Sequence, residues 1–356
     1  MIFSFFWGLI IIILVLEIAL RLTIGFHNPL LYRADPEIGY LLAPNQQVRR
    51  FRNRVVINKY SMRSSSLLEP KQGLRVLLLG DSVLNGSWWT DQADTISEMI
   101  KRRLTVDQNP LNLLEKKPPN SLEKMALNFP PFLRGARGDQ PVPNFQDQTY
   151  EKTIEILNAS ANGWSPRNLL AYLQKFGCFQ ADILVLLLNT DDLFGTAPTS
   201  IPVGLDRYYP SRKPALAILE AATRLLIPYT PPPEMAVVNA EGGDRVGFNL
   251  TALEAIYQIA QTEKSPLIIT LTPLWHEVSS QPKDYEILAR ERLDKFIQNR
   301  NIPYLDFLPI FQNHPDPKTL YRDQIHLNPL GNQLVSTEIS KLLVGETRHA
   351  NLEDKF

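Results

Sequence analysis

Short runs dominated by apolar residues recur along the chain. The clearest is 75–79, where four consecutive apolar residues follow Arg75 and Gly80 closes the run. A run that is apolar at successive positions, and not only at every second one, is typical of a strand covered on both faces, as in a parallel sheet. The other runs read as strands are 154–157, 183–188, 267–271 and 304–307.

Segments with apolar residues at helical spacing lie between these runs. They are 95–104, 166–176, 215–226, 250–262, 285–299 and 332–343. Strands that alternate with helices along a chain favour a parallel sheet with helices on both of its faces. The sequence therefore predicts an α/β fold.

The N-terminal segment is far more apolar than the rest of the chain. Residues 2–16 carry no charge, and after Glu17 the apolar pattern continues to Ile24. As a helix this stretch spans roughly 34 Å, which is enough to cross a bilayer. A cleaved signal peptide is the alternative, but it needs a positive n-region and a small-residue cleavage site, and neither is found. We therefore expect residues 1–25 to be a transmembrane anchor with the lipid bilayer as its partner.

The orientation of this anchor is set by few charges. No Lys or Arg precedes it, whereas Arg21 and Arg33 follow. By the positive-inside rule these two residues favour a cytoplasmic body.

The expected organisation continues with a polar, mostly irregular connector at 26–73. An α/β domain follows at 74–346, with Pro-rich insertions at about 107–148 and 196–246, and a tail at 347–356. Lys plus Arg and Asp plus Glu both total 37, so nothing in the charge balance favours nucleic acid. Cys178 is the single cysteine, so no internal disulfide forms, and it is read as a small core residue.

Polar residues follow the predicted strands, where functional groups gather in open parallel sheets. Gly80-Asp81-Ser82 follows the first strand, 158–163 the second and 189–192 the third, and Asp323 and His326 precede the last helix. A serine hydroxyl becomes a good nucleophile when a base takes its proton and a carboxylate orients that base. Because Asp323 and His326 are three residues apart, one turn brings them together, leaving the imidazole free to face a distant serine.

These four blocks resemble those of the GDSL-type (SGNH) hydrolase family over roughly residues 74–343. Further N-terminal segments, at 17–21, 35–40, 57–58 and 62–63, resemble the lead-in of bacterial membrane-anchored members. The resemblance implies a flavodoxin-like three-layer α/β/α sandwich and ester or acyl-transfer chemistry without cofactor or metal. It also implies an acylated carbohydrate or lipid as substrate, with the catalytic body on the exoplasmic (periplasmic) side.

The same resemblance assigns roles to individual residues. Ser82 would be the nucleophile, His326 the base and Asp323 the residue that orients it. The N–H groups of Ser82 and Gly163 would stabilise the oxyanion. The family places an Asn side chain as the third donor, where this chain has Asp191.

An ionised carboxylate accepts hydrogen bonds and cannot donate one. Asp191 could be protonated by burial, could turn away, or could be replaced by Asn189. The hypothesis we adopt is that Asp191 occupies the donor position and limits the rate at neutral pH.

Several readings stay open. Asp191 and Asp192 are interpreted as a solvated pair at a strand end and not as metal ligands. Trp88 and Trp89 serve either as a platform for substrate or as packing residues. The main hypothesis is an esterase or O-acyltransferase of the cell envelope, and the alternative is a catalytically weak module for binding or assembly at the membrane.

Overall fold

The computed structural model describes residues 2–107 and 153–353, so most of the predicted insertion at 107–148 lies outside the described residues. Five parallel strands form one sheet in the order β6-β5-β7-β8-β9. Their bounds are β5 Gly73–Gly80, β6 Thr153–Ser160, β7 Ile183–Asn189, β8 Leu267–Thr272 and β9 Tyr304–Asp306. Four of them contain a predicted run in full and β9 covers the first three residues of the run at 304–307, so the α/β prediction is confirmed.

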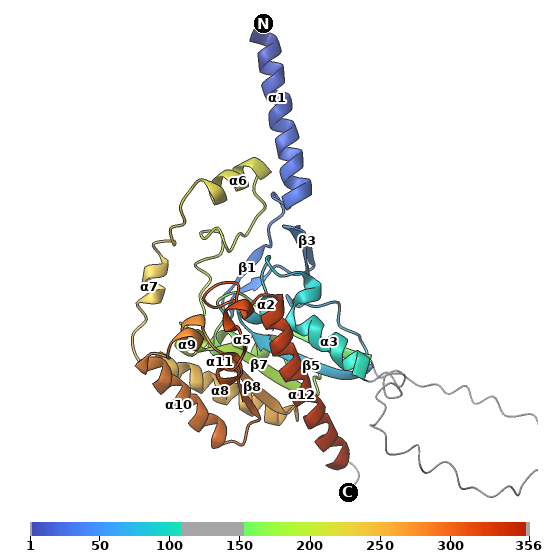
Figure 1. The fold of residues 1–356 in the computed structure, drawn as a ribbon, viewed down its shortest axis with the longest axis vertical. Helices are drawn as coiled ribbons and strands as arrows, with labels where there is room; N and C mark the ends of the chain where they lie inside the picture. Colours follow the sequence, from blue (N-terminus) through green and yellow to red (C-terminus); the bar gives the residue numbers. More distant parts are fainter. Residues whose placement is uncertain (1, 108–152, 354–356) are drawn as a thin grey trace, which may run out of the picture.

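Helices cover both faces of the sheet, which makes three layers (Figure 1). Side chains alternate along a strand, so Leu77 and Leu79 enter one core and Val76 and Leu78 the other. The helices of the first layer are α5 Pro166–Phe176, α8 Arg245–Thr262 and α10 Asp284–Gln298. Those of the second are α3 Ile96–Asp107, α11 Leu308–Gln312 and α12 Pro329–Glu353.

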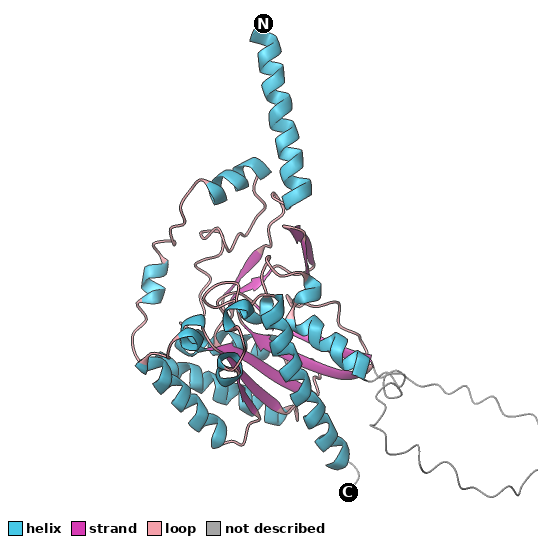
Figure 2. Cartoon of the chain, viewed as in Figure 1, coloured by secondary structure: helices cyan, strands magenta, loops and turns pink. Residues whose placement is uncertain are grey.

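The connector is more ordered than expected. Four strands within it form two antiparallel hairpins, so the prediction of a mostly irregular segment is wrong there (Figure 2). They are β1 Tyr32–Asp35 with β2 Gly39–Leu42, and β3 Gln46–Arg50 with β4 Asn53–Ile57. Ile38, Leu42 and Ile57 are buried in the same core as α5, so the connector is part of the α/β body.

The predicted tail is also partly helical, because α12 continues to Glu353. The second insertion carries α6 Ala217–Leu225 and α7 Met235–Asn239, and its path runs along the outside of the body (Figure 1). Two short helices complete the described part: α2 Ser82–Asn85 after β5 and α9 Trp275–Ser279 after β8.

The N-terminal helix α1, Ile2–Ala19, continues as a π-helical turn at Leu20–Ile24 and projects from the body (Figure 1). Within the described residues, Phe3–Ile24 is the one helix long and apolar enough to cross a membrane, with mean hydropathy 2.6. A single-pass anchor and a signal sequence both satisfy this test.

Candidate active site

The serine predicted as nucleophile stands where β5 meets α2. Asp81 caps α2 by accepting the Val83 N–H at 2.8 Å, which turns the chain and places Ser82 at the first helical position. Gly80 is required before this turn, because a Cβ there would meet the Leu187 carbonyl oxygen at 2.5 Å. The bend thus presents Ser82 beyond the carboxyl end of the sheet.

The loop before α12 brings the predicted base to this serine. His326 Nε2 lies 2.9 Å from Ser82 Oγ, and His326 Nδ1 lies 2.8 and 2.9 Å from the two Asp323 oxygens. An ionised carboxylate only accepts hydrogen bonds, so Asp323 fixes the proton on Nδ1 and leaves Nε2 free to accept the serine proton. The structure therefore joins the three residues in the order a serine hydrolase requires.

Asp323 is held in its charged form. Desolvation pushes its pKa up, but the N–H groups of His326 and Ile325 and the His326 imidazole outweigh this effect, and the pKa lies below its usual value. The two backbone bonds measure 2.9 and 3.0 Å. Asp323 is thus ready to stabilise an imidazolium on His326.

Both tryptophans that follow α2 take part in the site. The Trp89 ring meets the His326 imidazole edge-on, with centroids 4.7 Å apart, and the Arg322 guanidinium stacks 5.0 Å from the same Trp89 ring. Trp88 packs against Phe51 at 5.0 Å. Trp89 therefore helps to hold the base, while Trp88 connects the site to the β3–β4 hairpin.

Ser82 lines a cavity of about 510 Å³. Its wall includes His326, Gly163, Trp88 and Trp89, and it extends to Arg224 of α6. A volume of this size is typical of a site for a small molecule or a segment of a larger one.

Gly163 lies at this cavity, as predicted for an oxyanion donor, with a left-handed backbone (φ +72°) that favours glycine. The Tyr40 hydroxyl donates to the Asn162 carbonyl at 2.6 Å and fixes this turn. Asn162 also lines the cavity, and its side-chain amide donates to Ser87 Oγ at 3.1 Å. Asn162 was not singled out from the sequence, although it lies inside the 158–163 block.

The structure does not bring Asp191 to Ser82. Asp191 is not one of the described residues that line the Ser82 cavity, and its side chain is exposed. Partial desolvation, followed by the charges of Glu286 and Glu277, raises the pKa of Asp191. The Asp191 carboxylate therefore lies on the side of the molecule that α9 and α10 form.

Asn189, the predicted substitute, is engaged elsewhere. Its amide nitrogen donates to Asp81 Oδ2 at 2.7 Å, and its oxygen accepts the Asp191 N–H at 2.8 Å. The side chain thus caps the turn after β7 and supports Asp81. Of the predicted oxyanion donors, the backbone N–H groups of Ser82 and Gly163 are the two that this arrangement leaves in place.

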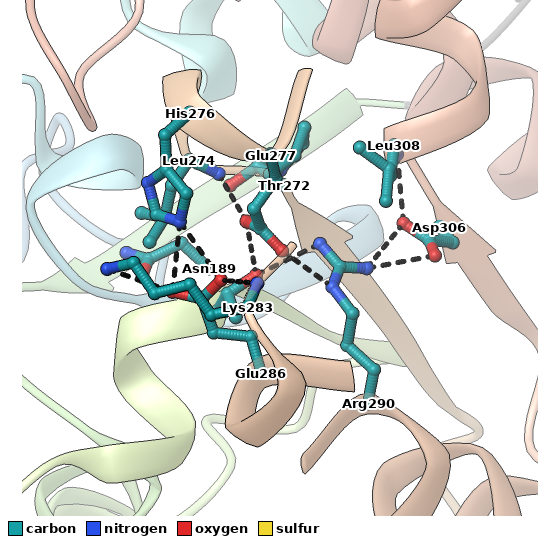
Figure 3. A network of polar contacts seen from close by, with 12 residues as sticks. Asn189, Thr272, Leu274, His276, Glu277, Lys283, Glu286, Arg290, Asp306 and Leu308 are labelled. Atoms are coloured by element: carbon teal, nitrogen blue, oxygen red, sulfur yellow. Dashed lines mark hydrogen bonds and ion pairs between the residues drawn. The ribbon is translucent and has the colours of Figure 1, made fainter. Parts of the chain in front are cut away.

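The α9–α10 side carries a separate polar network (Figure 3). Arg290 bonds Glu277 at 2.9 Å and Asp306 at 2.9 and 3.0 Å, and His276 bonds Glu286 at 2.9 Å. Each basic side chain of this network bonds at least one carboxylate, so the network connects α9 and α10 to β9. Within residues 2–107 and 153–353, no cluster of His, Cys, Asp or Glu is arranged to hold a metal ion.

A second buried carboxyl pair lies behind the nucleophile. Asp81 Oδ2 accepts from Ser82 Oγ at 3.1 Å, and Asp192 accepts the Asn189 N–H at 2.9 Å. Burial, reinforced by Asp81, raises the pKa of Asp192 well above its usual value. Burial also raises the pKa of Asp81, although hydrogen bonds and the nearby His326 oppose it.

The loop after α2 is held by Arg63, a role that the sequence did not reveal. The buried guanidinium donates to the carbonyls of Asn85 and Ser87 and, at 2.6 Å, to that of Thr90. Burial lowers the pKa of Arg63 to about 9, which still leaves it charged at neutral pH. This side chain thus fixes the segment that carries both tryptophans.

Comparison with known proteins places the chain in a family. Residues 131–334, more than half of the chain, match the GDSL-like Lipase/Acylhydrolase family. The matched region contains Gly163, Asp323 and His326, whereas Ser82 precedes it. No curated protein sequence matches the chain.

Some solved structures are similar to the chain at low sequence identity. A lipase/acylhydrolase from Enterococcus faecalis is 12% identical, with 77% of this chain and 96% of that chain covered and a TM-score of 0.42. An acetylxylan esterase from Geobacillus stearothermophilus, crystallised as a catalytic mutant, is 10% identical, with 77% and 95% covered and a TM-score of 0.41. The chain belongs to the GDSL-like lipase/acylhydrolase family of ester-hydrolysing enzymes.

Proposed function

We propose that the protein is a membrane-anchored serine esterase or O-acyltransferase that acts on acyl groups of a cell-envelope carbohydrate or lipid. The observation that carries the proposal is the unbroken chain of hydrogen bonds from Ser82 Oγ through His326 to Asp323. This arrangement needs neither cofactor nor metal to activate the serine.

The proposed reaction has two steps. In the first, Ser82 Oγ bonds to the ester carbonyl carbon and its proton passes to His326 Nε2, while the N–H groups of Ser82 and Gly163 stabilise the oxyanion. The alcohol then leaves with the proton from His326, and an acyl-Ser82 intermediate remains. In the second step, water or a sugar hydroxyl gives its proton to His326 and bonds to the acyl carbon, and His326 then returns the proton to Ser82 Oγ as the acyl–Ser82 bond breaks.

A fluorophosphonate probe tests the activated serine directly. The wild-type protein is expected to be labelled, and the Ser82→Ala variant is not. His326→Ala should label much more slowly, because the hydroxyl loses its base. Wild-type labelling that persists in Ser82→Ala would assign the reaction to another residue and overturn the proposed mechanism.

The membrane part of the proposal rests on α1, whose apolar side chains are exposed along its length. At 1.5 Å per residue, Phe3–Ile24 spans about 33 Å. We propose that it stays attached as a single-pass anchor and that the body lies on the exoplasmic side. Protease added to intact spheroplasts should then digest the body, whereas digestion only after lysis would place the body in the cytoplasm.

A further inference from the structure

Helix α6 buries a charged side chain and exposes a large apolar one. In a helix on the surface of a water-soluble body, apolar residues face inward and charged residues face outward. In α6, Glu220 is buried, whereas Leu219 is 51% exposed. The apolar surface continues through Leu225 at the helix end, which is 73% exposed, to Leu226 and Ile227, which are 79% and 57% exposed.

The inward charges of α6 are fully paired. The Glu220 carboxylate accepts from the buried Arg50 at 2.6 Å, from Arg224 at 3.0 Å and from the His27 N–H at 2.7 Å. These bonds hold the polar face of the helix against the β3–β4 hairpin. The leucines are consequently turned outward by specific contacts, and not by a loose attachment of the helix.

The start of α6 is joined to the anchor. Glu17 of α1 accepts the N–H groups of Ala217 and Ile218 at 2.9 and 3.0 Å, and Arg21 pairs with the same carboxylate. A carboxylate on an otherwise apolar span is costly in a bilayer unless it is paired. Here it is neutralised and also caps α6, which places the helix beside the end of α1 (Figure 1).

Exposed cations surround the same end of the body. Phe51, at the tip of the β3–β4 hairpin, donates its N–H to the Ile24 carbonyl at 2.7 Å, so this hairpin also adjoins the end of α1. Arg49 and Arg52 on the hairpin are exposed, as are Arg212 and Lys213 just before α6. Basic residues around an apolar surface are typical of elements that bind anionic lipid headgroups.

We propose that α6 and residues 225–227 lie in the headgroup region of the bilayer that α1 spans, with the outward leucines in its apolar boundary and the cations at anionic headgroups. This inference rests on the proposed function in one respect, namely that α1 is a membrane anchor. The cavity of about 760 Å³ that α6 lines shares Pro210 and Arg224 with the Ser82 cavity. The enzyme would therefore meet acyl esters that are presented at the membrane surface.

The test measures contact with lipid in the full-length chain. The protein is reconstituted into vesicles of phosphatidylethanolamine and phosphatidylglycerol, with one cysteine introduced by Leu219→Cys or Leu226→Cys and labelled with the fluorophore NBD. Cys178 is buried, so the introduced thiol is the accessible one. Lipids that carry a doxyl quencher near the headgroup or deep in the acyl chain then report the depth of the label.

Leu288→Cys is the matched control, because Leu288 is 59% exposed and belongs to α10, a helix that lies far from α1 (Figure 1). We expect loss of fluorescence at positions 219 and 226 and none at 288, with the shallow quencher more effective than the deep one. Weaker quenching is expected in vesicles of phosphatidylcholine alone, because the cations lose their anionic partners. Equal quenching there would overturn the electrostatic part of the proposal.

Other outcomes overturn the proposal as a whole. Quenching at 219 and 226 no stronger than at 288 would mean that α6 stays in water. A shift of NBD emission without quenching by lipid would mean that a second copy of the chain covers the leucines. Flotation of the protein with vesicles tests the anchor, and fluorophosphonate labelling tests Ser82, so failure of either remains distinguishable from failure of this inference.

Discussion

Ser82 Oγ and His326 Nε2 lie 2.9 Å apart, although 244 positions separate the two residues in the chain. The parallel sheet explains this proximity, since β5 carries the serine to the carboxyl edge and the loop before α12 returns to the same edge. The base and its carboxylate, by contrast, are joined locally by three residues. The catalytic geometry thus depends on one long-range contact.

The first prediction concerns this contact. Ser82→Ala and His326→Ala are each expected to lower kcat on a short acyl ester by about 10⁴-fold or more, because the nucleophile or its base is lost. Steady-state kinetics gives the rate, and circular dichroism with Tm serves as the folding control. Near wild-type turnover in Ser82→Ala would contradict the proposed role.

Asp191→Asn separates two expectations. Alignment with the family predicts a rise in kcat at neutral pH of about tenfold or more, since one oxyanion donor is worth roughly 2.7–4 kcal/mol. The exposed position of Asp191 on the α9–α10 side predicts a change within about twofold, as for other surface substitutions. We expect the smaller change, and a tenfold rise would show that the side chain reaches the oxyanion during the reaction.

Arg63→Met tests how the loop after α2 is held. Three carbonyls lose a buried donor, each costing about 1 kcal/mol or more, so the free energy of unfolding should fall by at least about 3 kcal/mol. We expect a lower kcat as well, because Trp89 and His326 are in contact. Arg292→Met, which removes an exposed pair with Asp244, is the control and should cost at most about 1 kcal/mol. Equal losses in urea denaturation of the two variants would contradict this role.

Most of the sheet strands were predictable because they are buried on both faces, which leaves a run rich in apolar residues such as 183–188. The hairpin strands were missed because each has only four or five residues, and in Tyr32–Asp35 two exposed residues lie between two buried ones. Such short segments show neither a continuous run nor strict alternation.

The contacts of the active site likewise divide into those that the sequence predicts and those that it does not. The triad follows from motifs that lie close together or directly after a strand. The role of Arg63 depends on carbonyls 22 to 27 positions away, and the cap on α6 depends on Glu17, 200 positions before it. Backbone donors and acceptors leave no residue-type signal in a sequence, so these contacts could not be inferred from it.

Stability should depend on pH through Asp192. An acid whose pKa is higher in the folded state than its unfolded value of about 3.9 favours folding most at low pH, and this contribution falls as pH rises through the window between the two values. We expect this contribution to the free energy of unfolding of the wild type to decrease as the pH rises from about 4 towards neutral. Asp192→Asn keeps an oxygen for the Asn189 N–H and should flatten this decrease.

Urea denaturation across this pH range measures the effect, with Asp316→Asn, an exposed change, as the control. Asp192→Asn is expected to be the more stable protein at the upper end of the range. An unchanged slope in this variant would show that Asp192 is ionised in the folded state throughout.

Pro210 and Arg224 line both the Ser82 cavity and the cavity beside α6, and this connection has a consequence for the kinetics. With α1 embedded and α6 in the headgroup layer, enzyme and ester would search for each other by lateral diffusion in a plane. Turnover would then follow the number of ester molecules per lipid and not their number per volume of solution. Adding ester-free lipid to the same membranes would slow the enzyme, even though every bulk concentration of enzyme and ester stayed the same.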